Sequence, residues 1–143
     1  MLGRETGKVR VKHVANRSKE TLHAEVNANV AAGSEVFTDE YVSYLGLDKT
    51  FVHEFVNHAE AYVRGNVHTN GMENFWSLLK RGLKGTYVSV EPFHLFRYLD
   101  EEVFRFNTRK ESDASRFIRA LRGIVGKRLT YEHLIGDEAT TPA

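Results

Sequence analysis

The spacing of apolar residues predicts that the chain opens with short strands and helices in alternation. Over residues 7–16, valines alternate with basic side chains, which is typical of a strand with one apolar face. Apolar residues then recur every four positions over residues 19–31, which predicts an amphipathic helix that starts after Ser18 and ends at Gly33. The apolar positions of this helix are Leu22, Val26 and Val30.

Two more strands and a short helix are expected next. Residues 35–38 predict a strand, and Asp39 falls at its carboxyl end. Residues 41–47 predict a short helix that Gly46 closes. Residues 51–56 alternate in character again and predict the last strand.

Helices fill the rest of the chain. One is predicted over residues 71–84 and ends at Gly85, and the next begins near Pro92, a residue that suits the first turn of a helix. The apolar stripe of the first comprises Met72, Phe75, Trp76, Leu79 and Leu83, and the second is expected to bury Phe93, Phe96, Leu99, Val103 and Phe106. A third helix carries Phe117, Ile118, Leu121 and Ile124. This order predicts an α/β fold with helices packed on a small mixed sheet.

Length and composition narrow the class of protein. The 143 residues fit one domain over residues 1–136, followed by a frayed, disordered tail over residues 137–143. The absence of cysteine excludes disulfides and thiolate metal sites and favours a reducing compartment. The sequence has neither an apolar run that could span a bilayer nor a signal-peptide pattern, so we expect a cytoplasmic protein with no membrane partner.

The net charge of +1 conceals an acidic middle and a basic C-terminal third. The acids from position 35 to 62 are Glu35, Asp39, Glu40, Asp48, Glu54 and Glu60, against the single base Lys49. The bases from position 105 to 128 are Arg105, Arg109, Lys110, Arg116, Arg119, Arg122, Lys127 and Arg128, against Glu111 and Asp113. Such a division suits a metal-dependent enzyme that acts on a polyanion, although solvated helix faces would give the same pattern.

Asp39 is the first candidate site residue. A carboxylate at the end of a buried strand costs free energy unless it is paired, hydrogen-bonded or bound to a metal. Functional groups also collect at the carboxyl ends of strands in α/β folds. The alternative is that Asp39 caps the short helix that follows, and Glu40 is expected to face solvent.

Glu73 and Lys80 form a second candidate, seven residues apart on one predicted helix. Seven steps of about 100° fall about 20° short of two full turns, so the two side chains lie on one side of the helix. A carboxylate and a cation arranged in this way suit a site for a metal ion and a phosphate. Asn70 and Glu73 also match a capping box, which needs no metal. The two interpretations are compatible, because a cap also fixes the direction of the side chain.

Histidines do not predict a zinc site. The spacing of His53, His58 and His68 matches no familiar ligand pattern. His68 lies near the carboxylates in sequence and is better explained as a polar group that contacts DNA or orients a ligand.

Several motifs together resemble the DDE-type transposases of bacterial insertion sequences. The first is Val-Phe-Thr-Asp-Glu-Tyr-x-x-Tyr from position 36, and the second is Val-His-Thr-Asn-Gly-x-Glu-Asn-Phe-Trp-Ser-Leu-Leu-Lys-Arg from position 67. Gly-Thr-Tyr from position 85, His-Leu-x-Arg-Tyr-x-x-Glu from position 94 and Phe-Arg-Phe-Asn-x-Arg from position 104 continue the match. The resemblance is to the group with the His-Thr-Asn-x-x-Glu-x-x-Trp signature and covers residues 8–110.

The resemblance implies a ribonuclease H-like mixed sheet flanked by helices, with three metal ligands. Asp39 matches the second ligand. The third falls at Asn70 or Glu73, because some members of this group use Asn at that position. Lys80 matches the helix cation that accompanies the ligands.

The resemblance also implies the chemistry, which is DNA cleavage and strand transfer during transposition. Two Mg²⁺ or Mn²⁺ ions about 3.5–4 Å apart would bind the scissile phosphate, and such ions prefer carboxylate oxygens. Lys80, Arg81 and Lys84 would neutralise DNA phosphates, and Arg105 and Arg109 are further candidates for DNA contact. The implied partners are transposon ends, target DNA and further copies of the complete protein, which places the protein at the nucleoid.

One departure from the family pattern concerns the first ligand. The family has an Asp on an opening strand, but no Asp precedes Asp39 in this sequence. We therefore expect an incomplete catalytic domain, truncated before its second strand, that cannot cut or join DNA alone. The alternatives are a DNA-binding remnant that regulates intact transposase and a host nuclease of the same fold.

Overall fold

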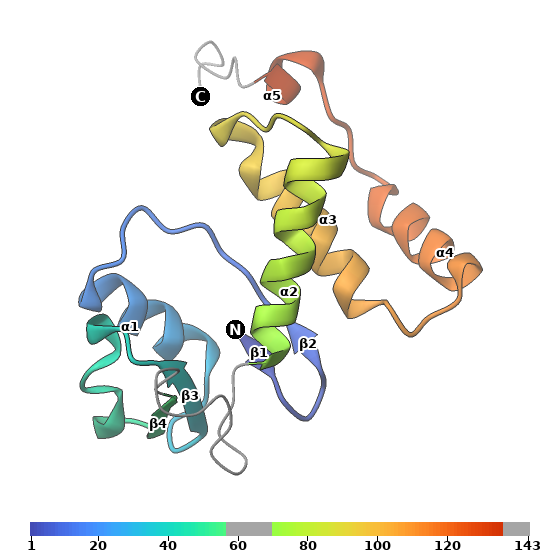
Figure 1. Cartoon of the computed structure of the whole chain (residues 1–143). Coiled ribbons are helices and arrows are strands. Elements are labelled where there is room, and N and C mark those ends of the chain that lie inside the picture. The colour runs from blue at the N-terminus through green and yellow to red at the C-terminus, as the bar shows by residue number, and fades with distance from the viewer. Residues whose placement is uncertain (57–69, 136–143) are drawn as a thin grey trace.

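The computed structural model describes residues 1–56 and 70–135, which form a mixed α/β structure (Figure 1). The strands are β1 (Leu2–Gly3), β2 (Lys8–Val9), β3 (Glu35–Asp39) and β4 (Val52–Val56). The α-helices are α1 (Lys19–Asn29), α2 (Asn70–Arg81), α3 (Leu95–Asn107), α4 (Asp113–Ile124) and α5 (Tyr131–Ile135). The expected α/β class is confirmed, and the tail over residues 137–143 lies outside the described part.

The strands of the described residues form two separate sheets, not the single mixed sheet that the sequence predicted. β1 and β2 pair antiparallel, with Leu2 opposite Val9. β3 and β4 pair parallel, in a register that runs from Glu35 opposite Val52 to Asp39 opposite Val56. The ribonuclease H-like sheet thus remains an implication of the resemblance.

The strand predicted over residues 7–16 is wrong beyond Val9. The backbones of Met1 and Arg10 still exchange two hydrogen bonds of 2.8 Å, and after them the chain leaves the hairpin. Within the described part, the positions after Arg10 belong to no ladder. Alternation of apolar residues therefore did not suffice to make a strand.

α1 covers the parallel sheet and forms the smaller of two cores. Ser18 caps the helix as predicted, because its Oγ accepts a hydrogen bond from the backbone N–H of Thr21 at 3.3 Å. Val26 of α1 is buried together with Leu47 and Phe51.

The single short helix predicted over residues 41–47 is replaced by two 3₁₀ turns. These turns are Val42–Tyr44 and Leu47–Lys49. Gly46 lies between them with φ of 94°, a conformation that glycine adopts without a Cβ penalty. The left-handed backbone of Gly46 ends the turn Val42–Tyr44 and allows the turn Leu47–Lys49 to begin.

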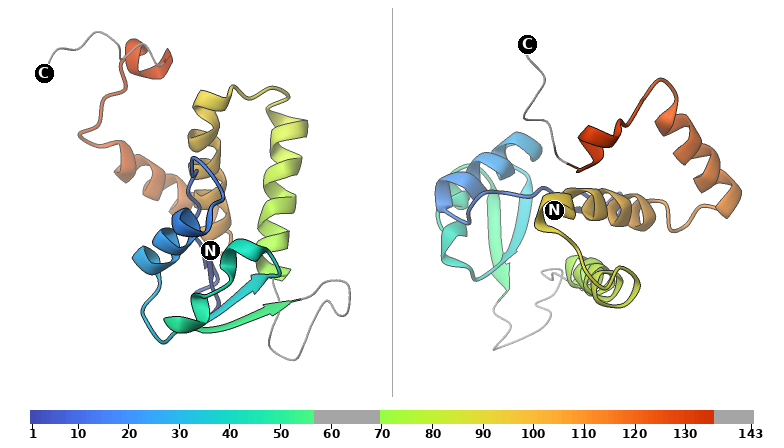
Figure 2. Two further views of the ribbon diagram at one scale, coloured as in Figure 1. Left: turned by 90° about the vertical axis from the view of Figure 1, so that its left-hand side faces the viewer. Right: turned by 90° about the horizontal axis from the view of Figure 1, so that it is seen from above.

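α2 and α3 form an antiparallel helical hairpin around the larger core (Figure 2). Phe75 has no exposed surface, and its ring meets that of Phe106 edge to face at 5.4 Å. Val9, Leu79 and Leu99 complete the buried cluster. The apolar stripes predicted for the two helices therefore do meet each other.

Three residues expected in these stripes are exposed instead. Trp76 lies at the edge of the α2 stripe, Phe93 lies in a 3₁₀ turn over Pro92–His94, and Phe96 lies in the first turn of α3. The rings of Phe93 and Phe96 meet edge to face. Gly85 also does not end the helix where predicted. α2 continues as a π-turn over Gly82–Thr86, in which the Tyr87 N–H donates to the Gly82 carbonyl at 3.1 Å.

The amide of Asn107 ties β2 to the end of α3. Its Oδ1 accepts from the Val9 N–H at 2.7 Å, and its Nδ2 donates to the Val9 carbonyl at 2.9 Å. β1 packs on the start of α2. The side chain of Leu2 lies so close to Gly71 that a Cβ at position 71 would clash with it. The hairpin at the start of the chain thus holds both helices.

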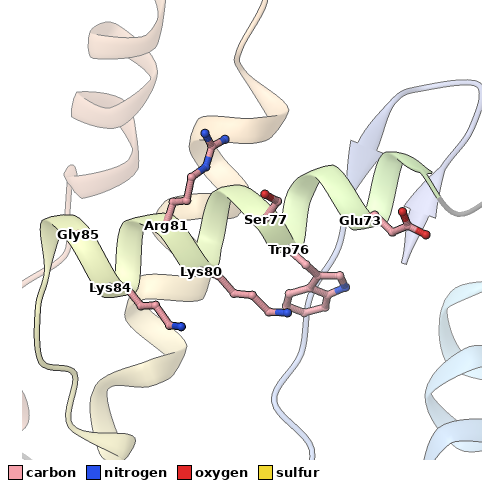
Figure 3. A pocket seen from close by; sticks show the side chains of 7 residues that line it. All are labelled: Glu73, Trp76, Ser77, Lys80, Arg81, Lys84 and Gly85. Carbon is pink, nitrogen blue, oxygen red and sulfur yellow. The ribbon is translucent and has the colours of Figure 1, made fainter.

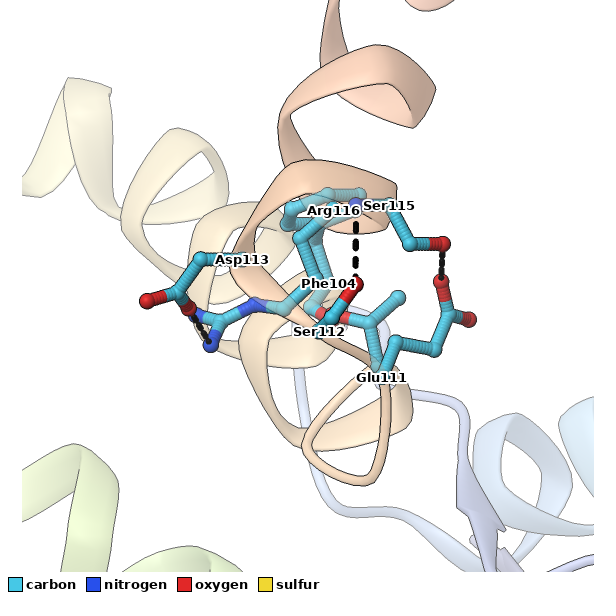
Figure 4. A network of polar contacts seen from close by, with 7 residues as sticks. Phe104, Glu111, Ser112, Asp113, Ser115 and Arg116 are labelled. Atoms are coloured by element: carbon cyan, nitrogen blue, oxygen red, sulfur yellow. Dashed lines mark hydrogen bonds and ion pairs between the residues drawn. The ribbon is translucent and has the colours of Figure 1, made fainter.

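α4 extends away from the helical hairpin (Figures 1 and 2), whereas α5 is joined to α3 by a 3.1 Å hydrogen bond from the Arg97 guanidinium to the carbonyl of His133. The start of α4 is fixed by polar contacts, among them a 3.3 Å bond from the Ser115 N–H to Ser112 Oγ and an ion pair of 3.1 Å between Arg116 and Asp113 (Figure 4). The third helix predicted from the sequence is present, but none of its residues is buried.

Replacement of Asn107 by Ala is expected to destabilise the fold by about 2–3 kcal/mol. The change removes two hydrogen bonds and leaves both backbone groups of a buried residue, Val9, without their partners. Urea unfolding measures the loss. Asn27→Ala, at an exposed position of α1, is the matched control and should change stability by less than about 0.5 kcal/mol. Equal effects of the two variants would contradict this role of Asn107.

Candidate functional site

One side of α2 carries an open groove of about 740 Å³ with a positive lining (Figure 3). It is lined by Glu73, Trp76, Ser77, Lys80, Arg81, Lys84 and Gly85. Three of these side chains are cations and one is a carboxylate, so the groove as a whole attracts anions.

The rotation of α2 about its axis follows from its apolar stripe. Phe75 and Leu79 are buried, which turns the opposite side of the helix to solvent. At about 100° per residue, Lys80 lies within about 20° of Glu73 around the helix, and Lys84 follows in the π-turn that continues α2. Figure 3 shows Glu73, Lys80 and Lys84 along one helix, and all three line the groove. The structure therefore places Glu73 and Lys80, which the spacing of seven had aligned, in the lining of one groove.

Asp39 lies at the exposed carboxyl end of β3, in a separate small pocket. Its Oδ1 accepts a hydrogen bond from the Tyr41 N–H at 3.3 Å. In the 3₁₀ turn Val42–Tyr44 that follows, the N-cap position is Tyr41 and no side chain caps the turn. Asp39 therefore does not cap this turn, and its hydrogen bond stabilises the bend between β3 and the turn. Glu40 is exposed, as predicted. The pocket is lined by Asp39, Glu40, Tyr41, Tyr44, Leu45, His53 and Phe55.

The pocket of Asp39 and the groove of Glu73 share no residue. Within residues 1–56 and 70–135, no three His, Asp or Glu side chains gather closely enough to hold a metal ion. The carboxylate oxygens of Asp39 and Glu73 are suitable donors for Mg²⁺. Their arrangement in the described part nevertheless does not make the two-ion site that the resemblance implies, and we derive no metal-dependent step from it.

Asn70 is the first residue of α2 and is exposed. The predicted capping box placed it one position ahead of the helix, a difference within the usual spread of helix boundaries. His68 and His58 lie outside the described residues. The choice between Asn70 and Glu73 as a ligand therefore stays a prediction.

A hydrogen bond between Thr38 and His53 supports the strand end that carries Asp39. Thr38 Oγ1 and His53 Nε2 are 2.9 Å apart across the parallel pair. Burial lowers the pKa of His53 from its ordinary value of 6.5, opposed by the charge of Asp48 and assisted by that of His23. Burial also raises the pKa of the neighbouring Tyr44, to which the charge of Asp39 contributes.

Arg105 and Arg109, predicted to contact DNA, make contacts within the chain. Arg105 Nε donates to Glu101 Oε1 at 2.9 Å, and the other oxygen of Glu101 accepts from the hydroxyl of Tyr87 at 2.6 Å. That hydrogen bond raises the pKa of Tyr87. The spacing of four between Glu101 and Arg105 was the signal in the sequence for this ion pair.

Arg109 joins the end of α3 to the N-terminal hairpin. Its guanidinium donates to the carbonyls of Gly7 at 3.1 Å and Phe106 at 2.7 Å, and it lies 4.2 Å from the centre of the Phe106 ring. No pattern in the sequence indicated this contact, because Gly7 and Arg109 are 102 residues apart.

Comparison with protein families defines the class of protein as a DDE transposase. The model of the ISXO2-like transposase domain matches residues 1–107, about three quarters of the chain. The chain therefore belongs to the ISXO2-like transposase family. The match includes Asp39, α2 and α3 and leaves out α4 and α5.

Neither the curated proteins nor the solved structures contain a match to this chain. In the described part of the chain, no helix is both long and apolar enough to cross a membrane.

The stability of the protein is expected to fall as the pH is lowered below about 6.5, in part through His53. Because the pKa of His53 is lower in the folded state, the unfolded chain takes up this proton first, and the folded state loses stability relative to it. Well above pH 6.5 both states hold neutral imidazole, and this contribution is constant there. NMR titration of the ring protons should give a pKa below 6.5, and His53→Gln should reduce the difference in unfolding free energy between pH 7.5 and 5. A ring that titrates above 6.5 would contradict the assignment.

Proposed function

We propose that this chain engages DNA in the cleavage and strand-transfer reactions of transposition. The observation that carries the proposal is the groove on α2, where Glu73, Lys80, Arg81 and Lys84 line one surface inside the region that matches the family. Transposon ends and target DNA are the proposed ligands. A homo-oligomer at the nucleoid is the proposed form of the complete transposase.

Lys80, Arg81 and Lys84 are the proposed phosphate contacts. All three are exposed, and the two lysines lie one helical turn apart, so that one DNA strand can meet both. Lys80 and Arg81 lie in the last turn of α2, where the helix dipole favours positive side chains, and Lys84 lies in the π-turn that follows.

Asp39 and one residue of the α2 start are the proposed ligands for Mg²⁺ or Mn²⁺. Glu73 is favoured over Asn70, because a carboxylate binds a hard cation more strongly than an amide does and because Glu73 lines the same groove as the cations. No Asp precedes Asp39 in the sequence, so a further ligand has to come from elsewhere. We therefore propose that this chain does not cut or join DNA by itself.

Regulation of an intact transposase through the basic C-terminal segment is less well supported. Arg116 and Arg119 in that segment already pair with Asp113 at 3.1 Å and Glu111 at 2.8 Å. These ion pairs reduce the charge that α4 offers to DNA, which leaves the α2 groove as the stronger candidate.

The double variant K80Q/K84Q is expected to bind duplex DNA at least tenfold more weakly at low salt. Each lost phosphate contact should also lower the slope of log affinity against log salt by about 1. Fluorescence anisotropy with a labelled duplex at several salt concentrations measures both quantities.

The matched control is K127Q/R128Q, which removes two charges from the segment outside the family match. It should leave the slope within about 0.5 of the wild-type value. If this control lowered the slope and K80Q/K84Q did not, the C-terminal segment would be the DNA-binding surface.

Mn²⁺ is expected to broaden the NMR signals of residues next to Asp39 and at the start of α2. Asp39→Asn should remove the first effect, and Glu73→Gln should reduce the second more than Asn70→Ala does, because Glu73 offers the charged donor. The opposite order of the α2 variants would assign the ligand to Asn70.

A strand-transfer assay on transposon ends with Mn²⁺ tests the incompleteness of the site. The wild-type chain alone should give no joined product, because two ligands do not hold two ions. Efficient joining by these 143 residues would contradict the proposal.

A further inference from the structure

Trp76 lies where the apolar stripe of α2 would predict a core residue, yet 39% of its surface is exposed. Its contact with Phe75 is edge to face, with ring centroids 5.2 Å apart. In the described part of the chain, no ring stacks in parallel on the indole. An aromatic side chain with this much exposed area, in a groove made otherwise of charged and small residues, is available to a ligand.

The neighbours of Trp76 indicate what that ligand is. Lys80 and Lys84 follow it at intervals of four residues, so the three side chains form a row along one side of α2 (Figure 3). An indole next to two cations matches a strand of nucleotides, in which a flat base and its phosphates follow one another. Glu73 at the far end of the groove leaves the balance of charge positive.

We propose that Trp76 stacks on an unpaired base of single-stranded DNA, with the adjoining phosphates held by Lys80 and Lys84. The inference rests on the proposed function, since it assigns part of the DNA in the same groove. In a duplex the faces of the bases are covered by their neighbours, so only an unpaired or extruded base can meet the indole. The groove thereby distinguishes frayed or single-stranded DNA from intact duplex.

The first test uses the fluorescence of Trp76, the single tryptophan of the chain. Addition of a twelve-residue thymidine oligonucleotide should quench the emission with saturation, whereas an oligomer of abasic sites with the same number of phosphates should bind more weakly and quench little. Equal affinity and equal quenching by the two oligomers would overturn the inference, because the bases would then contribute nothing.

The second test compares variants by anisotropy with labelled oligonucleotides. Trp76→Leu should weaken binding of the thymidine oligonucleotide about tenfold, while Trp76→Phe, which keeps an aromatic ring, should weaken it less. Both should bind a blunt duplex within twofold of the wild type. Phe93→Leu, at another exposed aromatic residue, is the control and should leave the affinity for both DNAs unchanged.

The outcomes separate this inference from the proposed function. If K80Q/K84Q weakens binding of every DNA and Trp76→Leu changes neither affinity, the groove binds phosphates alone and the stacking role is wrong. If no DNA binds to the wild-type chain, both proposals fail. If Trp76→Leu weakens the duplex as much as the single strand while circular dichroism stays unchanged, the indole contacts DNA without selecting unpaired bases, which also overturns the inference.

Discussion

The edge-to-face contact of Phe75 with Phe106 is the interaction on which the arrangement of this protein depends. It joins α2 to α3 at their most buried point and sets the rotation of α2 about its axis. Because α2 buries the side that carries Phe75 and Leu79, the residues on its opposite side face solvent. The position of the positive groove therefore follows from the packing of the core and does not require interactions among the charged residues.

The N-terminal hairpin supports this contact from a distant part of the chain. Asn107 satisfies both backbone groups of Val9, and Arg109 reaches the carbonyl of Gly7. Buried backbone groups need such partners, since an unsatisfied donor or acceptor costs about 1–3 kcal/mol. Asn107 and Arg109 thus contribute to the fold, whereas Lys80 and Lys84 line the groove.

Much of the secondary structure could be predicted from local patterns. The N-cap at Ser18, the strands that contain Phe37 and Phe55, and the buried positions Phe75 and Leu79 all follow from short-range periodicity and turn chemistry. The errors arose where the outcome depends on a neighbour in space. A valine alternation became a strand only at Val9, where β1 lies alongside, and Trp76 stayed exposed while Phe75 beside it was buried against Phe106.

By itself, the sequence determined the family motifs and the alignment of Glu73 with Lys80, because a spacing of seven on a helix fixes relative direction whatever surrounds it. Tertiary structure alone decided which candidate side chains remain available. It engaged Arg109 with the hairpin, and it put Asp39 and Glu73 in separate pockets. The physical reason is that hydrogen bonds between residues a hundred positions apart depend on packing, which no local pattern records.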